Sequence, residues 1–153
     1  MNEKTFNMYN KNRDIIALLK QNSRMTTNEI SKETGIAQTT VYNRIKKLQE
    51  MEIIDKFTIK LNNKAIGRGL SAYILCTVSY RTSKGEKLSQ IDVAKKVKVL
   101  PEVEEVAIVT GEIDLIVKVG VKDVDTLNDF VIIKLRDIEG IEKTITSVVL
   151  TEI

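Results

Sequence analysis

A stretch of the N-terminal third, residues 38–47, is crowded with hydroxyl, amide and cationic side chains and holds no Asp or Glu. Amides suit the edge of adenine, Arg and Lys suit guanine or phosphate, and Thr adapts to several partners. A helix face that is merely solvated more often mixes Glu among its Lys residues for i,i+4 pairing. The stretch therefore has the chemistry of a surface that reads DNA bases and holds phosphates. The candidate DNA-binding residues are Gln38, Thr39, Thr40, Tyr42, Asn43, Arg44, Lys46 and Lys47.

The helical period decides which of these side chains face outward. At about 100° per residue, Thr39, Asn43 and Lys46 fall together on one side, and Lys47 lies beside them. The pattern therefore predicts a polar face suited to the DNA major groove. The opposite side is an apolar stripe that the helix can bury, made of Val41, Ile45 and Leu48.

The stretch lies in a predicted helix-turn-helix. The segment RDIIALLKQN, residues 13–22, places apolar side chains on one face of a helix. Thr26 followed by Glu29 is a capping box that starts a second helix, and Gly35 suits the left-handed turn that ends it. A third helix is predicted over about 37–51. Two helices joined by a tight turn that contains Gly are typical of a helix-turn-helix, and the alternative is a plain helical hairpin with a solvated polar face.

The segment after the third helix alternates in polarity. Phe57, Ile59 and Leu61 are separated by polar residues, as in a half-exposed strand. A strand here would be the wing of a winged helix-turn-helix, with Lys56 and Lys60 within reach of phosphates. The alternative is an ordinary edge strand guarded by Lys.

The composition is that of an ordinary globular protein. Of its 153 residues, 42% are hydrophobic and 29% charged, and this length allows one medium domain or two small ones. Residues 1–62 carry 11 Lys and Arg against 7 Asp and Glu, whereas residues 63–153 carry 13 against 14. A basic head on a near-neutral body favours a polyanion partner, here double-stranded DNA. The chain has neither an apolar run of membrane-spanning length nor a signal-peptide core, so we expect a cytoplasmic protein that does not enter a membrane.

A different order of elements follows the polar segment NNKAIGRG, where the domain junction is expected. The patterns predict strand, helix, strand, strand, helix and strand, the ferredoxin-like βαββαβ arrangement. The fold class is therefore α+β, with an N-terminal winged helix-turn-helix followed by a ferredoxin-like βαββαβ domain. The expected boundaries are 1–62 for the head, 63–70 for a linker and 71–153 for the βαββαβ domain. The predicted elements of that domain span 72–80, 88–99, 103–110, 115–121, 124–137 and 144–150.

Both faces of the predicted sheet are apolar. Along 72–78, even-numbered residues point to one face and odd-numbered residues to the other, and both sets are largely apolar. The two helices can cover only one face, and an open apolar face is rarely left in water. We expect a second copy of the chain to cover it, with Leu75 and Ile108 in the interface of a two-fold dimer. The alternative cover is the N-terminal domain.

The residues needed for catalysis or metal binding are missing from the sequence. The chain has no His, no phosphate-binding Gly-rich loop and no nucleophilic Ser elbow. No Cys or His cluster could hold zinc, and the single Cys76 lies mid-strand, where a small buried side chain is expected. We therefore expect no enzyme, no catalytic residue, no metal and no cofactor.

The sequence resembles the Lrp/AsnC family, the leucine-responsive or feast/famine transcriptional regulators. The resemblance covers about residues 12–150 and rests on four segments in order: DIIALLKQNSR, EISKETGIAQTTVYNRIKKLQEMEII, LPEVEEVAIVTGEIDLIVKV and IEGIEKTITSVVL. It implies a winged helix-turn-helix head on a ligand-sensing domain that binds effectors and mediates oligomerisation. It also implies dimers through the sheet, often assembled into octamers, and amino-acid effectors bound between dimers.

The resemblance further implies an effector site around the turn TGEID. In the family this site centres on a Gly-x-x-Asp turn, here Gly111 and Asp114, helped by a Thr-x-Thr stretch and by residues near 100–102. A carboxylate suits an α-ammonium group, and Gly lets backbone N–H groups approach an α-carboxylate. The alternative is that the two residues only shape a hairpin. The candidate effector-binding residues are Gly111, Asp114, Thr144, Thr146, Leu100 and Glu102.

Several residues depart from the family's usual pattern. Asn12 stands where an acidic residue is usual, and Ala37 and Gln38 stand where Ser or Pro is usual nearby. Ala37 is a poor N-cap. Glu52 replaces a usual Gly, and Ile113 replaces a common aromatic residue, which bears on the effector that fits.

Three functions remain open at the level of sequence. The leading interpretation is a sequence-specific DNA-binding transcriptional regulator modulated by an amino acid. A non-specific architectural protein that wraps DNA around an octamer is one alternative. Another is a small-molecule-binding domain whose N-terminal helices only mediate association, and salt-dependent DNA binding would reject it.

Overall fold

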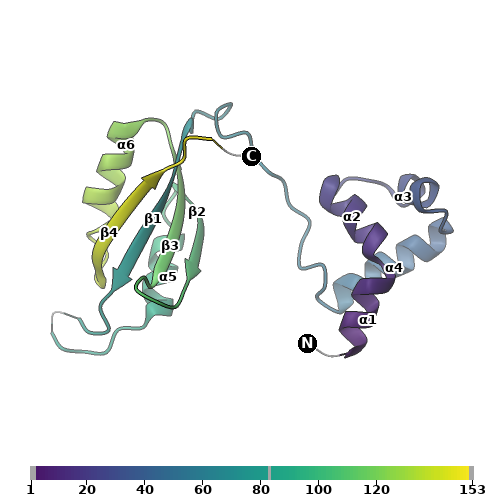
Figure 1. Ribbon diagram of the computed structural model, residues 1–153, viewed down its shortest axis with the longest axis horizontal. Helices are drawn as coiled ribbons and strands as arrows, with labels where there is room; N and C mark the ends of the chain where they lie inside the picture. The colour runs from purple at the N-terminus through teal and green to yellow at the C-terminus, as the bar shows by residue number, and fades with distance from the viewer. Residues whose placement is uncertain (1–2, 83, 152–153) are drawn as a thin grey trace. The chain divides into compact units, whose positions relative to one another are not determined.

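The computed structural model describes residues 3–82 and 84–151, which form two compact units (Figure 1). The first unit ends at Lys60 and the second begins at Leu61. The outer ends of the expected head and body, residues 1–2 and 152–153, lie outside the described residues. No helix in the described part of the chain is long and apolar enough to cross a membrane.

The first unit contains the three predicted helices and one that was not predicted. The unpredicted helix, α1, has the polar sequence EKTFNMYNK and buries none of its residues, so its pattern carries no sign of a core face. The other three helices bury their apolar stripes against one another around Ile15, Leu19, Ile30 and Val41. The four helices are α1 (Glu3–Lys11), α2 (Arg13–Gln21), α3 (Thr27–Thr34) and α4 (Gln38–Glu50).

Local hydrogen bonds set the turn between α3 and α4. The Glu29 backbone N–H donates to the Thr26 hydroxyl oxygen at 3.2 Å, and the Thr26 N–H donates to the Glu29 carboxylate at 2.7 Å. This is the predicted capping box, and these bonds from Thr26 lower the pKa of Glu29. Gly35 ends α3 with φ of 69°, the predicted left-handed conformation. Ala37 gives α4 no side-chain cap, whereas Gln38 donates to the Thr27 hydroxyl oxygen at 3.1 Å and ties α4 to α3.

Glu52, just after α4, also adopts a left-handed backbone, with φ of 55°. A non-glycine residue in this left-handed region costs about 1–2 kcal/mol. We therefore expect Glu52→Gly to raise the free energy of unfolding by about 0.5–1 kcal/mol, even after the larger entropy of unfolded Gly is subtracted. Denaturant unfolding would measure the change, and Gln49→Gly within α4 should be destabilising by a similar amount. An unchanged or lower value for Glu52→Gly would contradict the prediction.

Residues 55–61 contain no strand, so the strand predicted over 57–61 was wrong. A strand needs a neighbour to complete its hydrogen-bond ladder, and this segment has none among the described residues. The Thr58 carbonyl accepts a hydrogen bond from the Ser23 hydroxyl at 3.3 Å, which holds the segment near the end of α2. Its alternating apolar side chains remain exposed: Phe57, Ile59 and Leu61.

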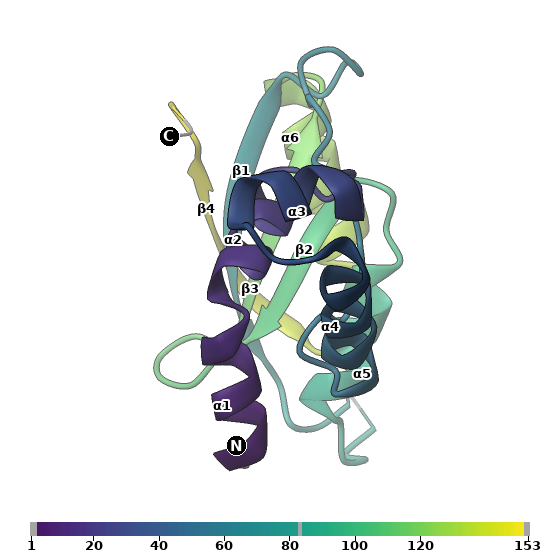
Figure 2. The same cartoon turned by 90° about the vertical axis from the view of Figure 1, so that its right-hand side faces the viewer.

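The second unit has the predicted βαββαβ order. Its four strands form one antiparallel sheet in the order β2-β3-β1-β4 (Figures 1 and 2). The last predicted helix is split, because α6 continues as a single π-helical turn, η1. The elements are β1 (Leu70–Val78), α5 (Gln90–Lys98), β2 (Val103–Ile108), β3 (Leu115–Val121), α6 (Val124–Asp129), η1 (Phe130–Leu135) and β4 (Ile141–Val148).

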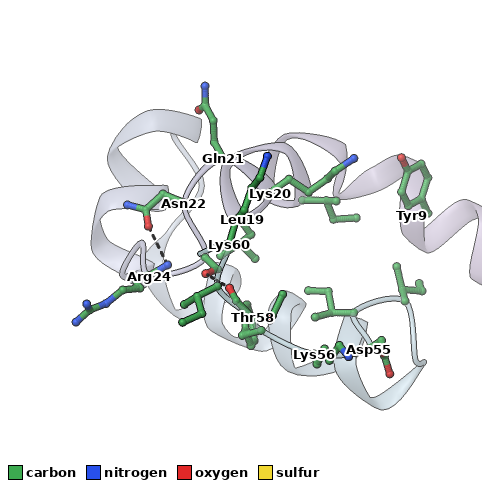
Figure 3. A pocket seen from close by; sticks show the side chains of 16 residues that line it. Tyr9, Leu19, Lys20, Gln21, Asn22, Arg24, Asp55, Lys56, Thr58 and Lys60 are labelled. Carbon is green, nitrogen blue, oxygen red and sulfur yellow. Dashed lines mark hydrogen bonds between the residues drawn. The ribbon is translucent and has the colours of Figure 1, made fainter. Parts of the chain in front are cut away.

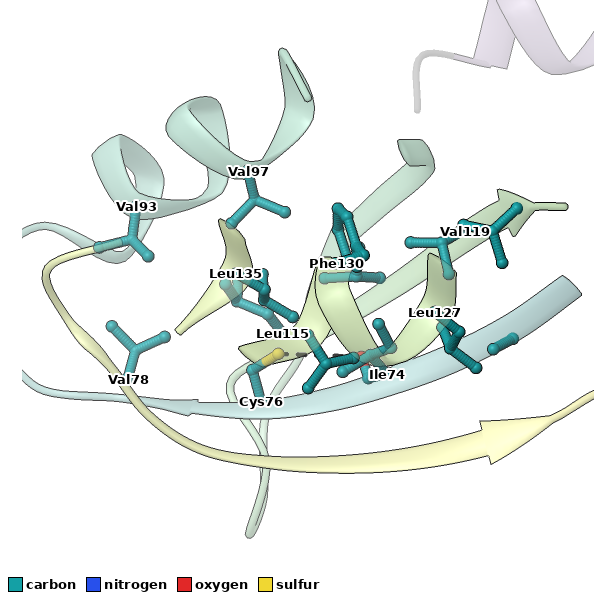
Figure 4. Close-up of a cluster of buried hydrophobic side chains, with 14 residues drawn as sticks. Ile74, Cys76, Val78, Val93, Val97, Leu115, Val119, Leu127, Phe130 and Leu135 are labelled. Carbon is teal, nitrogen blue, oxygen red and sulfur yellow. Dashed lines mark hydrogen bonds between the residues drawn. The ribbon is translucent and has the colours of Figure 1, made fainter. Parts of the chain in front are cut away.

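The core of the second unit lies between the helices and one face of the sheet (Figure 4). The even-numbered residues of β1 from 72 to 78 point into it, as predicted, and meet Val93 and Val97 of α5 and Phe130 of η1. Cys76 is fully buried there, and burial raises the pKa of its thiol to about 11. The prediction of a small buried side chain at this position is confirmed.

The opposite face of the sheet carries an apolar row that crosses all four strands. Leu75 of β1 lies opposite Ile145 on one side and Ile116 on the other, and Ile116 lies opposite Ala107. Directly paired residues point to the same face, so these four side chains stand together. None of the four is fully buried, and Ile145 is 47% exposed.

The expectation that Ile108 shares this open face was wrong. Ile108 pairs with Leu115, which is buried in the helix-covered core, so Ile108 points to the helix side. Alternation could not choose the face here, because Val106, Ala107 and Ile108 are three successive apolar residues.

The segment expected as a linker is tied to the sheet at its first residue. The Asn63 side-chain amide donates to the Glu104 carboxylate, and the other Glu104 oxygen lies 3.6 Å from the Lys118 ammonium. A Cβ at Gly120 would lie 2.5 Å from a Glu104 oxygen, so the absence of a side chain leaves room for this cluster. Asn63 thus belongs structurally to the second unit.

Candidate DNA interface and effector site

Helix α4 presents most of the predicted DNA-binding residues to solvent. Its apolar stripe is confirmed, because Val41 and Leu48 are fully buried and Ile45 is half-buried. Thr40 and Arg44 lie half-buried on the flank of the helix. The exposed members of the predicted set are Gln38, Thr39, Tyr42, Asn43, Lys46 and Lys47.

The outward face of α4 makes few side-chain bonds that contact with DNA would break. Asn43 and Lys47 form no side-chain hydrogen bond or ion pair with the described residues, so contact with DNA would break none. Lys46 lies 3.9 Å from Glu50, one turn further along the helix, in an exposed pair. Such exposed pairs contribute little and are easily replaced by a phosphate contact. The face therefore offers an amide and two ammonium groups to a groove.

A groove of about 840 Å³ lies elsewhere in the first unit (Figure 3). It runs between α1, α2 and the unpaired segment after α4, and none of the predicted DNA-binding residues line it. Apolar side chains such as Leu19 and Ile54 form part of its wall. Its basic lining residues are Lys20, Arg24, Lys56 and Lys60.

Asp114, the predicted ammonium ligand, already accepts three hydrogen bonds. They come from the Val78 backbone N–H at 2.8 Å, the Tyr80 hydroxyl at 3.1 Å and the Gln90 side-chain amide. The hydrogen bond to Asp114 raises the pKa of Tyr80. The carboxylate therefore fastens the β2–β3 turn to the end of β1 and to α5. An ammonium group would have to share or replace the Tyr80 and Gln90 donors.

Gly111 and Thr144 lie near the same end of β1. Gly111 has φ of 124°, and a Cβ there would meet nothing within 4 Å, so the turn is open beside it. Thr144 is paired with Cys76, whose carbonyl accepts the Asp114 backbone N–H at 2.9 Å. Arg136 donates to the Thr144 hydroxyl oxygen at 3.1 Å. Thr146 follows two residues along β4, on the same face as Thr144.

Leu100 and Glu102 lie at the opposite end of β2 from the Asp114 turn. The Glu102 carboxylate accepts a hydrogen bond from Lys134, and its second oxygen is buried without a partner among the described residues. Burial acts to raise the pKa of Glu102, but hydrogen bonds from Lys134 and from the Glu102 backbone N–H, together with the charges of Lys134 and Arg68, leave the pKa lowered. Within one chain the predicted effector residues therefore fall in two places.

Sequence reasoning missed the side chains that hold the effector residues. The side-chain donors to Asp114 and Glu102 lie 24 to 34 residues away along the chain, and no local spacing connects them; Arg136 lies eight residues before Thr144. No cluster of His, Cys, Asp and Glu within residues 3–82 and 84–151 could hold a metal. The missed partners are Tyr80, Gln90, Lys134 and Arg136.

Two family models match the chain. Residues 10–55 match a winged helix-turn-helix DNA-binding domain, and residues 75–153 match the Lrp/AsnC ligand binding domain. An uncharacterised HTH-type transcriptional regulator of Pyrococcus horikoshii is 42% identical over 136 residues, which cover 89% of this chain and 88% of that protein. The HTH-type transcriptional regulator FL11 of Pyrococcus furiosus is 39% identical over 136 residues, 89% of this chain and 85% of FL11.

Solved structures share the whole fold. The structure of AsnC from E. coli matches with a TM-score of 0.77 at 27% identity, over 94% of this chain and 92% of that one. A transcriptional regulator of Neisseria meningitidis, solved as a complex with L-Met, matches with a TM-score of 0.78 at 23% identity, over 100% of this chain and 92% of that one.

Proposed function

The chain belongs to the Lrp/AsnC family of HTH-type transcriptional regulators, which are not enzymes, and from this we propose that α4 reads a specific operator in the DNA major groove. The observation that carries the proposal is the outward face of α4, where an amide, a hydroxyl and two ammonium groups stand exposed above a buried apolar stripe. The groups suit base edges and phosphates. Because the protein is proposed to contact chromosomal DNA, we propose that it acts in the cytoplasm.

Fragment selection from the source genome tests this proposal. The purified protein would be mixed with genomic fragments, and the bound fragments sequenced and titrated against random duplexes. A specific regulator should bind a selected fragment about 10³-fold or more tighter than random DNA at physiological salt. Equal affinity for both would favour the architectural, DNA-wrapping alternative.

We propose that the second unit assembles the protein. The open apolar row on the sheet supports a two-fold dimer, and two heads could then address two half-sites. Further assembly of dimers to octamers would follow the pattern that the family resemblance implies. In this arrangement residues 1–62 serve as the DNA-binding head, 63–70 as the connection and 71–153 as the effector-binding and oligomerisation domain.

We also propose that an amino acid binds at the turn that holds Gly111 and Asp114. The open space beside Gly111 and the carboxylate of Asp114 support an α-amino acid. The L-Met complex of the Neisseria meningitidis regulator shows that one protein of this fold takes such a ligand. Leu100, Glu102, Thr144 and Thr146 complete the proposed site, with the first two contributed by another copy of the chain because they lie at the far end of β2.

Calorimetric titration with the twenty amino acids should first identify the ligand. We then expect Asp114→Asn to weaken it at least about 10-fold, because the charge that holds the ammonium is lost. The matched control is Tyr80→Phe, which removes one hydrogen bond to Asp114 without changing its charge. Tyr80→Phe should bind the ligand as well as the wild type or better, because a lone pair of the carboxylate is freed.

Two results would contradict the effector site. No heat with any amino acid, together with unchanged light scattering, would remove amino acids as effectors. Loss of folding in Asp114→Asn, seen by denaturant unfolding, would leave Asp114 only its structural role between Val78, Tyr80 and Gln90.

A further inference from the structure

Charge in the second unit is segregated along the chain. Residues 81–98, which are α5 and the loop before it, hold six Lys and Arg against two Asp and Glu. The rest of residues 63–153 holds seven against twelve. The near-neutral total therefore hides a basic segment in an otherwise acidic unit. Its cations, called here the α5 basic surface, are Arg81, Lys84, Lys87, Lys95, Lys96 and Lys98.

All six cations are exposed. Arg81 and Lys87 face each other in an antiparallel bridge, and the Thr82 N–H donates to the Glu86 carbonyl at 2.8 Å, so the two flanks of the loop are paired. In α5, Val93 and Val97 point into the core, which turns Lys95 directly outward. The nine residues of α5 span about 14 Å.

None of the six cations forms an ion pair with a carboxylate among the described residues. Two of them bond backbone carbonyls instead: Arg81 donates to Gly85 at 2.9 Å and Lys98 to Glu104 at 2.7 Å. The three Lys residues in the last turn of α5 interact favourably with the helix dipole. That effect explains their place on the helix, but it does not explain the cations of the loop at the other end.

We propose that the α5 basic surface is a second DNA contact, which holds phosphates of the duplex that flanks the sequence read by α4. Duplex DNA carries about one charge per 1.7 Å of its axis, so a basic surface about 14 Å long faces several phosphates. The inference rests on the proposed function, because a duplex bound by α4 is held at high effective concentration near the body. The contact adds affinity for long DNA without reading sequence.

Salt titrations on two duplex lengths test this contact. The variant combines Lys87→Gln with Lys95→Gln, and the matched control combines Lys64→Gln with Lys122→Gln, which removes two exposed cations of the same body. Each full-length protein is titrated against random duplexes of about 20 and about 60 base pairs, roughly two and six helical turns. We expect the salt slope of the Lys87/Lys95 variant to fall by about 2 on the long duplex only. The Lys64/Lys122 control should have the wild-type salt slope on both duplexes.

The outcomes separate this inference from the proposed function. A wild type that binds neither duplex would refute DNA binding itself. A Lys87/Lys95 variant that matches the wild type on the long duplex would overturn only the second contact, as would an equal loss in the Lys64/Lys122 control. A change in the sedimenting mass of the Lys87/Lys95 variant would also overturn it, because the surface would then be an assembly contact.

Discussion

Replacing Leu75 with Asp splits the assembled protein into smaller species in sedimentation. Leu75 is central in the apolar row on the open face of the sheet, between Ile116 and Ile145. A dimer that buries this row would enclose the new carboxylate without a partner, which costs several kcal/mol and exceeds what most interfaces can lose. The expected dissociation is therefore large at micromolar protein.

A second variant separates assembly from folding. Ile145→Asp changes a side chain that is 47% exposed in the single chain, so its effect arises mainly in the assembled state. The control is Ile133→Asp on η1, an exposed apolar residue outside the row, which should retain the dimer. If Leu75→Asp and Ile145→Asp both keep the wild-type mass, the apolar row is not the interface.

Replacing Asn43 or Lys47 with Ala weakens operator binding by about 1–3 kcal/mol each, the range of a good base contact. Both side chains are exposed on the outward face of α4 and bonded to no described residue. Lys46→Ala should instead weaken binding to all sequences alike and lower the salt slope by about 1, as expected for a phosphate contact. Gel-shift titrations against a selected fragment and random DNA measure both quantities.

The control for this series is Gln49→Ala, which removes an exposed amide from the flank of the same helix. It should leave affinity for the selected fragment unchanged, whereas Asn43→Ala should not. Unchanged binding by Asn43→Ala, Lys46→Ala and Lys47→Ala together would remove α4 from the groove.

Local sequence signals predicted the parts of the fold that local interactions determine. The capping box of Thr26 and Glu29, the turn at Gly35 and the buried stripe of α4 each depend on residues within a few positions. Alternation in β1 likewise predicted that Cys76 shares a face with the other even-numbered residues, which α5 and η1 cover. These features needed no knowledge of distant contacts.

The features that failed depend on strand pairing and side-chain contacts that the local sequence pattern does not reveal. The segment 57–61 has the alternation of a strand but no neighbouring strand to pair with. The face of Ile108 is set by its register against Leu115, which the run of apolar residues in β2 does not reveal. Tyr80 and Gln90 are 34 and 24 residues from the Asp114 carboxylate that they donate to. No spacing rule could have linked them.

The π-helical turn η1 allows relatives of this protein to be one residue shorter within this helix. Such a turn accommodates one residue more than an α-helical turn, and within Phe130–Leu135 the residues that point to solvent include Ile132 and Ile133. Deleting either one would let the turn close as an ordinary α-helix. Phe130 would still point into the core. Leu135 would move one position earlier and stand seven residues after Leu127, which keeps both on the same helical face. Relatives that lack one residue here should thus retain the same sheet and the same core. We therefore expect η1 to absorb a one-residue deletion inside the helix rather than in a loop.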